Sequence, residues 1–231
     1  MAIIIKPEDI IVEFLRARLT DPRGRHTADS DSFTATSGQT EFTLTPTAAG
    51  SLVRAITGVT VASTGKKKWQ EYSIDLKAPK VTLETGATTG QTVVVNYLAS
   101  ASGSEWIYPG MPIATMGKTN FPRISVQLVN MTSDRAGPVT APLIDSVHFQ
   151  IDTWTKEGYT KTISSEFYTE QKLADYLGER VKEAFGDNID DLYPKLYDYS
   201  GVAFGQMPFE EATHTFRHKQ EITLTGLNVS H

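Results

Sequence analysis

The stretch from Asp31 to Pro46, DSFTATSGQTEFTLTP, decides how this chain is organised. In its second half, Phe42 and Leu44 alternate with polar residues, and threonine, serine and glycine make up most of the rest. Period-two alternation with these residue types is typical of a β-strand that buries one face. The segment that precedes it is typical of a helix, so the structural pattern of the chain changes near residue 31.

The first periodic segment, KPEDIIVEFLRARL at residues 6–19, predicts an amphipathic helix. Pro7 suits the first helical turn, and the acidic residues after it suit the positive end of the helix dipole. The helix is expected to end near Thr20, because Pro22 and Gly24 follow. The predicted buried face consists of Ile11, Phe14, Leu15 and Leu19.

Short alternating runs continue from residue 31 to about residue 101, and glycines separate them. The clearest runs cover residues 59–61, 72–76, 81–83 and 93–97. Short strands between closely spaced turn signals predict a small β-sandwich or barrel. The lysines at 66–68 are expected in a hairpin loop exposed to solvent, and contact with an anionic surface is the alternative.

Beyond residue 104 the pattern changes again. FPRISVQLVN at 121–130 and SVHFQIDTW at 146–154 predict two strands that pair antiparallel. YTEQKLADYLGERVKEAFGDN at 168–188 predicts a helix with Thr169 as its N-cap and Gly186 as its end. A second strand pair is expected at 192–204 and 214–227. The predicted buried face of the helix consists of Leu173, Leu177, Val181, and Ala184 or Phe185.

These elements predict an α+β fold with an interrupted main domain. The first helix cannot bury its apolar face against a β-domain that closes on its own core, so it must pack on the later strands and helix. The main domain is therefore expected at 1–30 and 104–231, with the order α-β-β-α-β-β and an antiparallel sheet. The inserted β-domain is expected at 31–103, since surface loops accept such insertions when their ends lie close together.

Composition narrows the function classes. The 231 residues carry a formal net charge of −5, which argues against a protein that mainly grips nucleic acid. There is no cysteine, which excludes disulfides and thiolate chemistry. Neither a secretory signal nor an apolar stretch long enough for a membrane span is visible, so we expect a chain made and folded in a cytoplasm and no membrane partner.

The search for catalytic, cofactor and metal motifs gives nothing specific. Phosphate loops, zinc-protease helices and nucleophile elbows are missing from the sequence. His214 and His218 are expected to share one face of a strand and could bind a metal only with a carboxylate such as Glu210. The aspartates at 187, 190 and 191 lack the spacing of a calcium loop. We therefore expect no enzyme, no cofactor and no metal.

Aromatic residues gather in segments rich in proline, glycine and methionine around the main domain. Exposed tyrosine, tryptophan and methionine favour contact between proteins. The alternative is that these segments fold back on the core. The candidate subunit interface consists of Trp106, Tyr108, Tyr197, Tyr199, Phe204 and Met207.

Four segments resemble the tail-terminator or tail-completion proteins of long-tailed bacteriophages and related viruses. They are IIVEFLRARL at 10–19, FPRISVQ at 121–127, VHFQIDTWTKEGY at 147–159 and KLADYLGERVKEAF at 172–185. The resemblance covers about residues 1–30 and 104–231 and rests on the order of helices and strands and on these short sequence segments.

The inserted segment resembles a β-module of phage fibres and virion surface proteins. FTATSGQTEFTL at 33–44, GVTV at 58–61 and TGQTVVVNYLA at 89–99 carry this likeness. The usual V-x-V-N-G phrase is replaced by AITGVTVAST at 55–64, which leaves the geometry of that hairpin open.

The first resemblance implies a structural virion protein of the tail or neck. Such a protein forms a ring, with a hexamer as the expected form, that ends tail-tube polymerisation and joins the tail to the neck and head. Its implied partners are copies of itself, the tail tube protein and neck or head-completion proteins. Viral DNA would pass through without specific binding. The alternative is a binding module whose inserted β-domain recognises a glycan or host surface.

Overall fold

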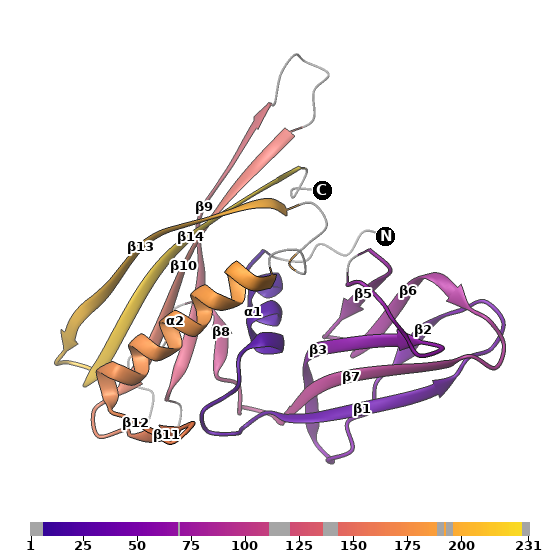
Figure 1. The fold of residues 1–231 in the computed structure, drawn as a ribbon, viewed down its shortest axis with the longest axis horizontal. Coiled ribbons are helices and arrows are strands. Elements are labelled where there is room, and N and C mark those ends of the chain that lie inside the picture. Colours follow the sequence, from indigo (N-terminus) through magenta and orange to yellow (C-terminus); the bar gives the residue numbers. More distant parts are fainter. Residues whose placement is uncertain are drawn as a thin grey trace. The chain divides into compact units, whose positions relative to one another are not determined.

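The computed structural model describes residues 7–68, 70–110, 121–135, 143–188, 192 and 196–227. It contains two helices and mostly antiparallel sheets, so the predicted α+β class is confirmed. The chain divides into two compact units, each shown in Figure 1. The main unit comprises Met1–Leu15 and Trp106–His231, and the inserted unit comprises Arg16–Glu105. Among the described residues, neither helix is long and apolar enough to cross a membrane.

The inserted unit is a sandwich of two sheets. Its four-stranded sheet has the order β1 (Thr27–Thr34), β7 (Thr92–Ala101), β3 (Ser51–Val61), β4 (Thr64–Gly65). Its three-stranded sheet has the order β2 (Gln39–Thr43), β6 (Lys80–Ala87), β5 (Tyr72–Asp75). Apolar side chains from both sheets form one buried cluster, which includes Phe42, Val59, Val81 and Val95. Alternating strands of the predicted kind therefore supply the core of this unit.

The inserted unit begins earlier than the sequence pattern indicated. Its first strand starts at Thr27 and pairs with the end of β7, where Thr27 lies opposite Ala99. The predicted boundary at residues 30 and 31 therefore differs from the boundary between Leu15 and Arg16 in the structure. Strand β1, TADSDSFT, is an edge strand without a buried side chain, so it lacks the apolar alternation that marks strands in sequence.

A polar turn connects the helix to β1. The Asp21 carboxylate accepts hydrogen bonds from the backbone N–H of Arg23 (3.0 Å) and of Arg25 (2.7 Å). The Arg25 guanidinium donates two further bonds of 2.7 Å to the same carboxylate. Burial alone would raise the pKa of Asp21, but these hydrogen bonds and the charge of Arg25 outweigh it and lower the pKa.

His26 lies next to this turn. Burial, followed by the positive charge of Arg16, lowers the pKa of His26 to about 4, while Asp21 opposes the shift. Neither ring nitrogen has a hydrogen-bond partner among the described residues. His26 is therefore a neutral histidine at neutral pH.

The main unit is built on a five-stranded sheet. Its order is β13 (Leu196–Glu210), β14 (Thr215–Leu227), β10 (Leu143–Lys156), β9 (Arg123–Arg135), β8 (Ile107–Pro109). Both predicted strand pairs are present as antiparallel neighbours, β9 with β10 and β13 with β14. The sequence did not predict β8, which lies parallel to β9 at the sheet edge.

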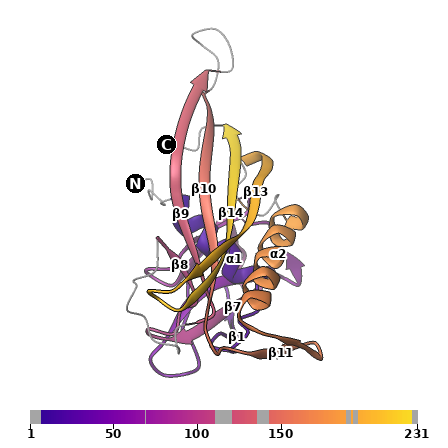
Figure 2. The same ribbon diagram turned by 90° about the vertical axis from the view of Figure 1, so that its left-hand side faces the viewer.

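Two helices cover one face of this sheet, α1 (Pro7–Arg18) and α2 (Glu170–Asn188) (Figures 1 and 2). The Phe14 and Phe185 rings join them, with centroids 5.2 Å apart. Thr169 occupies the predicted N-cap position, and its carbonyl accepts the N–H of Leu173. The predicted end at Gly186 is wrong, because the helix continues to Asn188. Both predicted apolar faces are buried: Ile11, Phe14, Leu15 and Leu19; Leu173, Leu177, Val181, Ala184 and Phe185.

A small hairpin between β10 and α2 was also missing from the prediction. It consists of β11 (Lys161–Ile163) and β12 (Glu166–Tyr168). Its two turn residues, Ser164 and Ser165, both have positive φ, at 51° and 72°. Asparagine and glycine are the usual residues of such a turn, so the Ser-Ser pair hides it in the sequence.

Candidate interaction surface

Strand β10 divides its side chains between two environments. Val147, Phe149 and Ile151 are buried, as predicted, on the face that the helices cover. Polar residues continue the same face, where Thr153 Oγ1 donates to a carbonyl of α2 at 2.7 Å and Thr155 Oγ1 does the same. The strand thus fixes α2 through apolar packing at one end and hydrogen bonds at the other.

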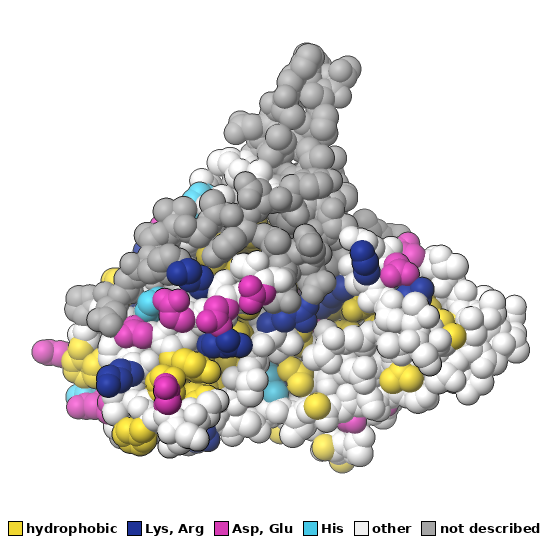
Figure 3. Space-filling view, viewed as in Figure 1, with side chains coloured by type: hydrophobic (Ala, Val, Ile, Leu, Met, Phe, Trp, Pro, Cys, Tyr) yellow, Lys and Arg dark blue, Asp and Glu magenta, His cyan; other side chains and the backbone are white. Residues whose placement is uncertain are grey.

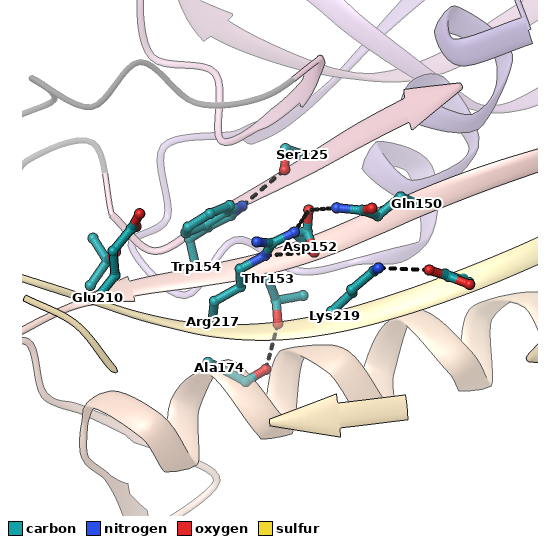
Figure 4. A network of polar contacts seen from close by, with 11 residues as sticks. Ser125, Gln150, Asp152, Thr153, Trp154, Ala174, Glu210, Arg217 and Lys219 are labelled. Carbon is teal, nitrogen blue, oxygen red and sulfur yellow. Dashed lines mark hydrogen bonds and ion pairs between the residues drawn. The ribbon is translucent and has the colours of Figure 1, made fainter. Parts of the chain in front are cut away.

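The opposite face of β10 carries a buried polar network (Figure 4). Asp152 is fully buried and accepts two 2.9 Å bonds from the Arg217 guanidinium of β14. Gln150 donates a third bond, of 2.7 Å, to the same carboxylate. The Arg217 guanidinium also lies over the Trp154 ring, 4.8 Å from its centroid, and Trp154 Nε1 donates to Ser125 Oγ at 2.9 Å. The network joins β9, β10 and β14.

This network fits a structural role better than a catalytic one. The Asp152 carboxylate already accepts three hydrogen bonds, so it has little capacity left to act as a base. The indole of Trp154 and the guanidinium of Arg217 are likewise engaged with each other. Bidentate arginine pairing of this kind fixes geometry, and here it holds β14 against β10, while the Trp154–Ser125 hydrogen bond ties β10 to β9.

The two histidines considered as metal ligands are separated by the fold. His214 has φ 52° and lies in the turn before β14, so its predicted place in the strand is wrong. Its Nδ1 hydrogen-bonds to Glu157 Oε2 at 2.7 Å. His218 is buried in β14, with Nδ1 3.0 Å from Asp175 Oδ1 of α2. Within the described ranges, no three histidine, aspartate or glutamate side chains form a metal-binding group.

The aspartates at 190 and 191 lie outside the described residues, and Asp187 is exposed in the last turn of α2.

Among the six candidate interface residues, Trp106 is placed in the core. Its side chain is fully buried, and its carbonyl accepts the N–H of Ile124 at 2.7 Å. The next residue starts β8, which pairs with β9. Trp106 is therefore not available at the surface of the chain, and its assignment to a subunit interface is not supported.

The other five candidates fall on two edge strands. Tyr108 is half-buried in β8, with the Arg123 guanidinium 4.1 Å from its ring centroid. Met207 is half-buried in β13, the strand at the opposite edge. Tyr197, Tyr199 and Phe204 also belong to β13, and their side chains lie outside the described part. Edge strands are where a sheet can meet another chain, so these positions stay predictions.

The far end of β9 exposes apolar residues that the sequence analysis did not single out. Opposite β10, Leu128 pairs with Phe149 and Asn130 with His148, so Val129 is the extra residue of a bulge. Val129 is 59% exposed and Met131 is 38% exposed. Residues 129–132 are all exposed although alternate side chains point to opposite faces. Both faces of the strand are therefore open to solvent along this stretch.

We call residues 129–135 of β9 and 143–146 of β10 the sheet arm. Figures 1 and 2 show that this end of the two strands reaches past the helices that cover the rest of the sheet. The sequence contained one signal for it: LVNMT breaks the alternation of ISVQL before it. The exposed apolar side chains of Val129 and Met131 on this arm can add contact area on a neighbouring protein.

Two further exposed aromatics lie at the other end of the main unit. Phe167 of β12 is 64% exposed, and Phe209 near the end of β13 is 38% exposed. Figure 3 shows hydrophobic side chains gathered over β11, β12 and the start of α2. The tilted rings of Tyr168 and Tyr176 lie there with centroids 4.7 Å apart. Phe167, Tyr168 and Tyr176 form a second apolar area, separate in sequence from the sheet arm, while Phe209 contacts Phe216 with ring centroids 4.7 Å apart.

Comparisons with known proteins add no relative. No protein-family model matches the chain, and no curated protein matches it.

Proposed function

We propose that this chain is a structural protein of a tailed virus that forms a closed ring at the end of the tail tube. The expected ring is a hexamer. It ends polymerisation of the tube and joins the tail to the neck and head. The proposal rests on the four segments that resemble tail-terminator proteins. Its partners are copies of itself, the tail tube protein and neck or head-completion proteins.

The observation that supports this proposal best is the sheet arm. A closed ring requires two different surfaces on each subunit, one of which meets an unlike surface on the neighbour. The arm offers one such surface, because Val129 and Met131 are exposed on a strand that leaves the core. The second apolar area, around Phe167, lies on β12 and α2 of the same unit and supplies a different surface.

The charge balance is compatible with a ring through which DNA passes. The formal net charge of −5 gives the chain no general attraction for phosphates. Within the main sheet, Arg217 is engaged with Asp152 and Lys219 with Glu221. In this proposal the virion is the protein's location, and viral DNA crosses the ring without specific binding.

The proposal is tested by the mass of the purified chain in solution and by negative-stain images, alone and with the tail tube protein. We expect a closed ring, formed by the chain itself or on the end of the tube. The double variant Val129→Ser, Met131→Ser should shift the chain toward the monomer without loss of helix signal. A monomer that neither caps nor binds the tube under these conditions would refute the proposal.

A matched variant separates the arm from the rest of the surface. Phe167→Ser removes an apolar side chain of similar exposure from β12. If Phe167→Ser dissociates the ring and the arm variant does not, the contact surface includes the second apolar area instead of the arm. Tyr197→Ser with Tyr199→Ser tests the edge strand β13 in the same assay.

A further inference from the structure

The inserted unit contains a pocket of about 460 Å³. Its floor is apolar, because Val61, Leu83 and Ala87 are among its lining residues and are buried. Its volume lies within the range of small-molecule sites, about 300–1,000 Å³. The polar residues that line it are Thr64, Lys66, Gln70, Glu71, Glu84, Thr85, Thr88 and Gln91.

The first wall is a hairpin turn in an unusual conformation. Ala62 and Ser63 join β3 to β4 with φ of 48° and 66°, in the left-handed region where glycine and asparagine are usual. The strands on either side pair at only two positions, Thr60 with Gly65 and Val61 with Thr64. Strained residues of this kind persist where the surrounding structure holds them, and they are common at ligand sites.

The second wall is a bulged segment of β6. Gln39 of β2 lies opposite Ala87, and Glu41 lies opposite Thr82. Between these two pairs, β2 has the single residue Thr40 and β6 has the four residues 83–86. Strand β6 therefore carries three extra residues at this point. Bulges redirect side chains away from the regular ladder, and they are frequent beside binding sites.

Gly86 holds this bulged segment close to the neighbouring backbone. A Cβ atom added at Gly86 would lie 2.6 Å from the carbonyl oxygen of Gly38, so no side chain fits there. Three departures from regular sandwich geometry thus border the same pocket: the turn at 62–63, the bulge at 83–86 and the close contact of Gly86. Local departures of this kind concentrate at functional sites in natural proteins.

The chemistry of the lining selects a class of ligand. Lys66 forms an ion pair of 2.9 Å with Glu71, which leaves Glu84 as the excess charge of the pocket. A net negative lining disfavours phosphates, sulfates and carboxylated ligands. Both Glu71 oxygens are engaged with Lys66 and Lys67, and Gln91 Oε1 accepts the N–H of Thr88. The Gln70 amide, the Glu84 carboxylate and three threonine hydroxyls supply both donors and acceptors around the apolar floor. A pyranose ring has this complementary form, with hydroxyls at its rim and C–H groups on its faces.

We propose that this pocket of the inserted unit binds a neutral saccharide, with Glu84 and Thr85 as hydroxyl-binding residues at its rim. The proposal does not depend on the ring function of the main unit. It gives a site and a ligand class to the binding role that the sequence left open for the inserted β-domain.

The experiment uses the full chain and saturation-transfer NMR with neutral mono- and disaccharides of glucose, galactose, mannose and N-acetylglucosamine. We expect saturable binding of at least one neutral sugar. Glu84→Ala and Thr85→Ala should each weaken it by about tenfold, as expected when a hydroxyl loses its hydrogen-bond partner. Glu41→Ala is the matched control, because its carboxylate is 60% exposed on β2 and does not line the pocket.

Three results would overturn the proposal. The first is that none of the neutral sugars binds saturably. The second is that Glu84→Ala and Thr85→Ala bind as tightly as the unaltered chain. The third is that sialic acid or a sulfated sugar binds in preference to every neutral probe. Unchanged backbone amide shifts outside the pocket in both variants would show that any lost affinity is local.

Discussion

Gly178→Ala tests the packing of α2 on the sheet most sharply, because two effects on stability have opposite sign. In an isolated helix, replacing glycine with alanine stabilises by about 1 kcal/mol. At Gly178, however, an added Cβ would lie 2.7 Å from Nε2 of His218 and even closer to its Cδ2. Carbon atoms in contact are ordinarily separated by about 3.5–4.0 Å, so helix and strand would have to move apart by about 1 Å.

Neither partner can move freely. His218 is 6% exposed and hydrogen-bonds to Asp175 one turn earlier in the same helix. The Gly178 carbonyl accepts a hydrogen bond from Gln220 of β14, which also ties the helix to the strand. Overpacking a tight core costs about 1–3 kcal/mol. After the propensity gain of about 1 kcal/mol is subtracted, the expected net effect of Gly178→Ala is a loss of about 0–2 kcal/mol.

Gly186→Ala is the matched control in the same helix. A Cβ at Gly186 would meet no atom within 4 Å, so only the propensity gain remains, reduced to about 0.5 kcal/mol near the helix end. The assay is urea unfolding followed by the helical band of circular dichroism, which reports chiefly on α2. Gly178→Ala in a His218→Ala background should cost less than in the unaltered chain. If Gly178→Ala is as stable as Gly186→Ala, the close approach of α2 and β14 is not real.

Three other perturbations have predicted outcomes. Leu177→Asp places a charge on a side chain that is 2% exposed and should leave the protein unfolded or insoluble, while Lys182→Asp on the exposed face should be nearly silent; soluble yield and melting distinguish them. Asp152→Asn should lower the free energy of unfolding in urea by about 2–4 kcal/mol, because Arg217 keeps its charge without a carboxylate partner. Substitutions at the surface usually change this free energy by no more than about 0.5 kcal/mol, so a cost below about 0.5 kcal/mol would contradict this account. His26 has a pKa of about 4 in the folded chain and 6.5 when unfolded, so the unfolded state gains its proton first and stability should fall as the pH drops from 6.5 to about 4; His26→Gln should flatten the pH dependence of the urea midpoint in that window.

The sequence predicted the elements whose apolar periodicity is regular. The buried faces of α1 and α2 and the pairing of β9 with β10 follow from the spacing of residues such as Leu177 and Phe149. It failed where tertiary contacts replace that pattern. Thr153 and Thr155 are buried although polar, because backbone carbonyls of α2 accept hydrogen bonds from their hydroxyl groups. A sequence gives no sign of a partner that arrives from a distant segment.

The candidate surface was harder to predict than the fold. Trp106 has the character of an interface residue in isolation, and only the pairing of β8 with β9 shows that it belongs to the core. Val129 has the character of a core residue, yet the bulge in β9 leaves it exposed. Residue type alone predicts neither outcome, because the pairing and register of a strand decide which of its side chains face the core.

The pairing of Thr27 with Ala99 gives the inserted unit neighbouring ends, which is the geometry that domain exchange requires. The first and last strands of this unit are neighbours in one sheet, so its two ends leave it side by side. Any domain with similarly adjacent termini could be spliced at the same place without stretching the chain that receives it. A lineage could thus replace this unit by recombination while the main unit is retained, and an engineer could use the same junction to display a foreign domain.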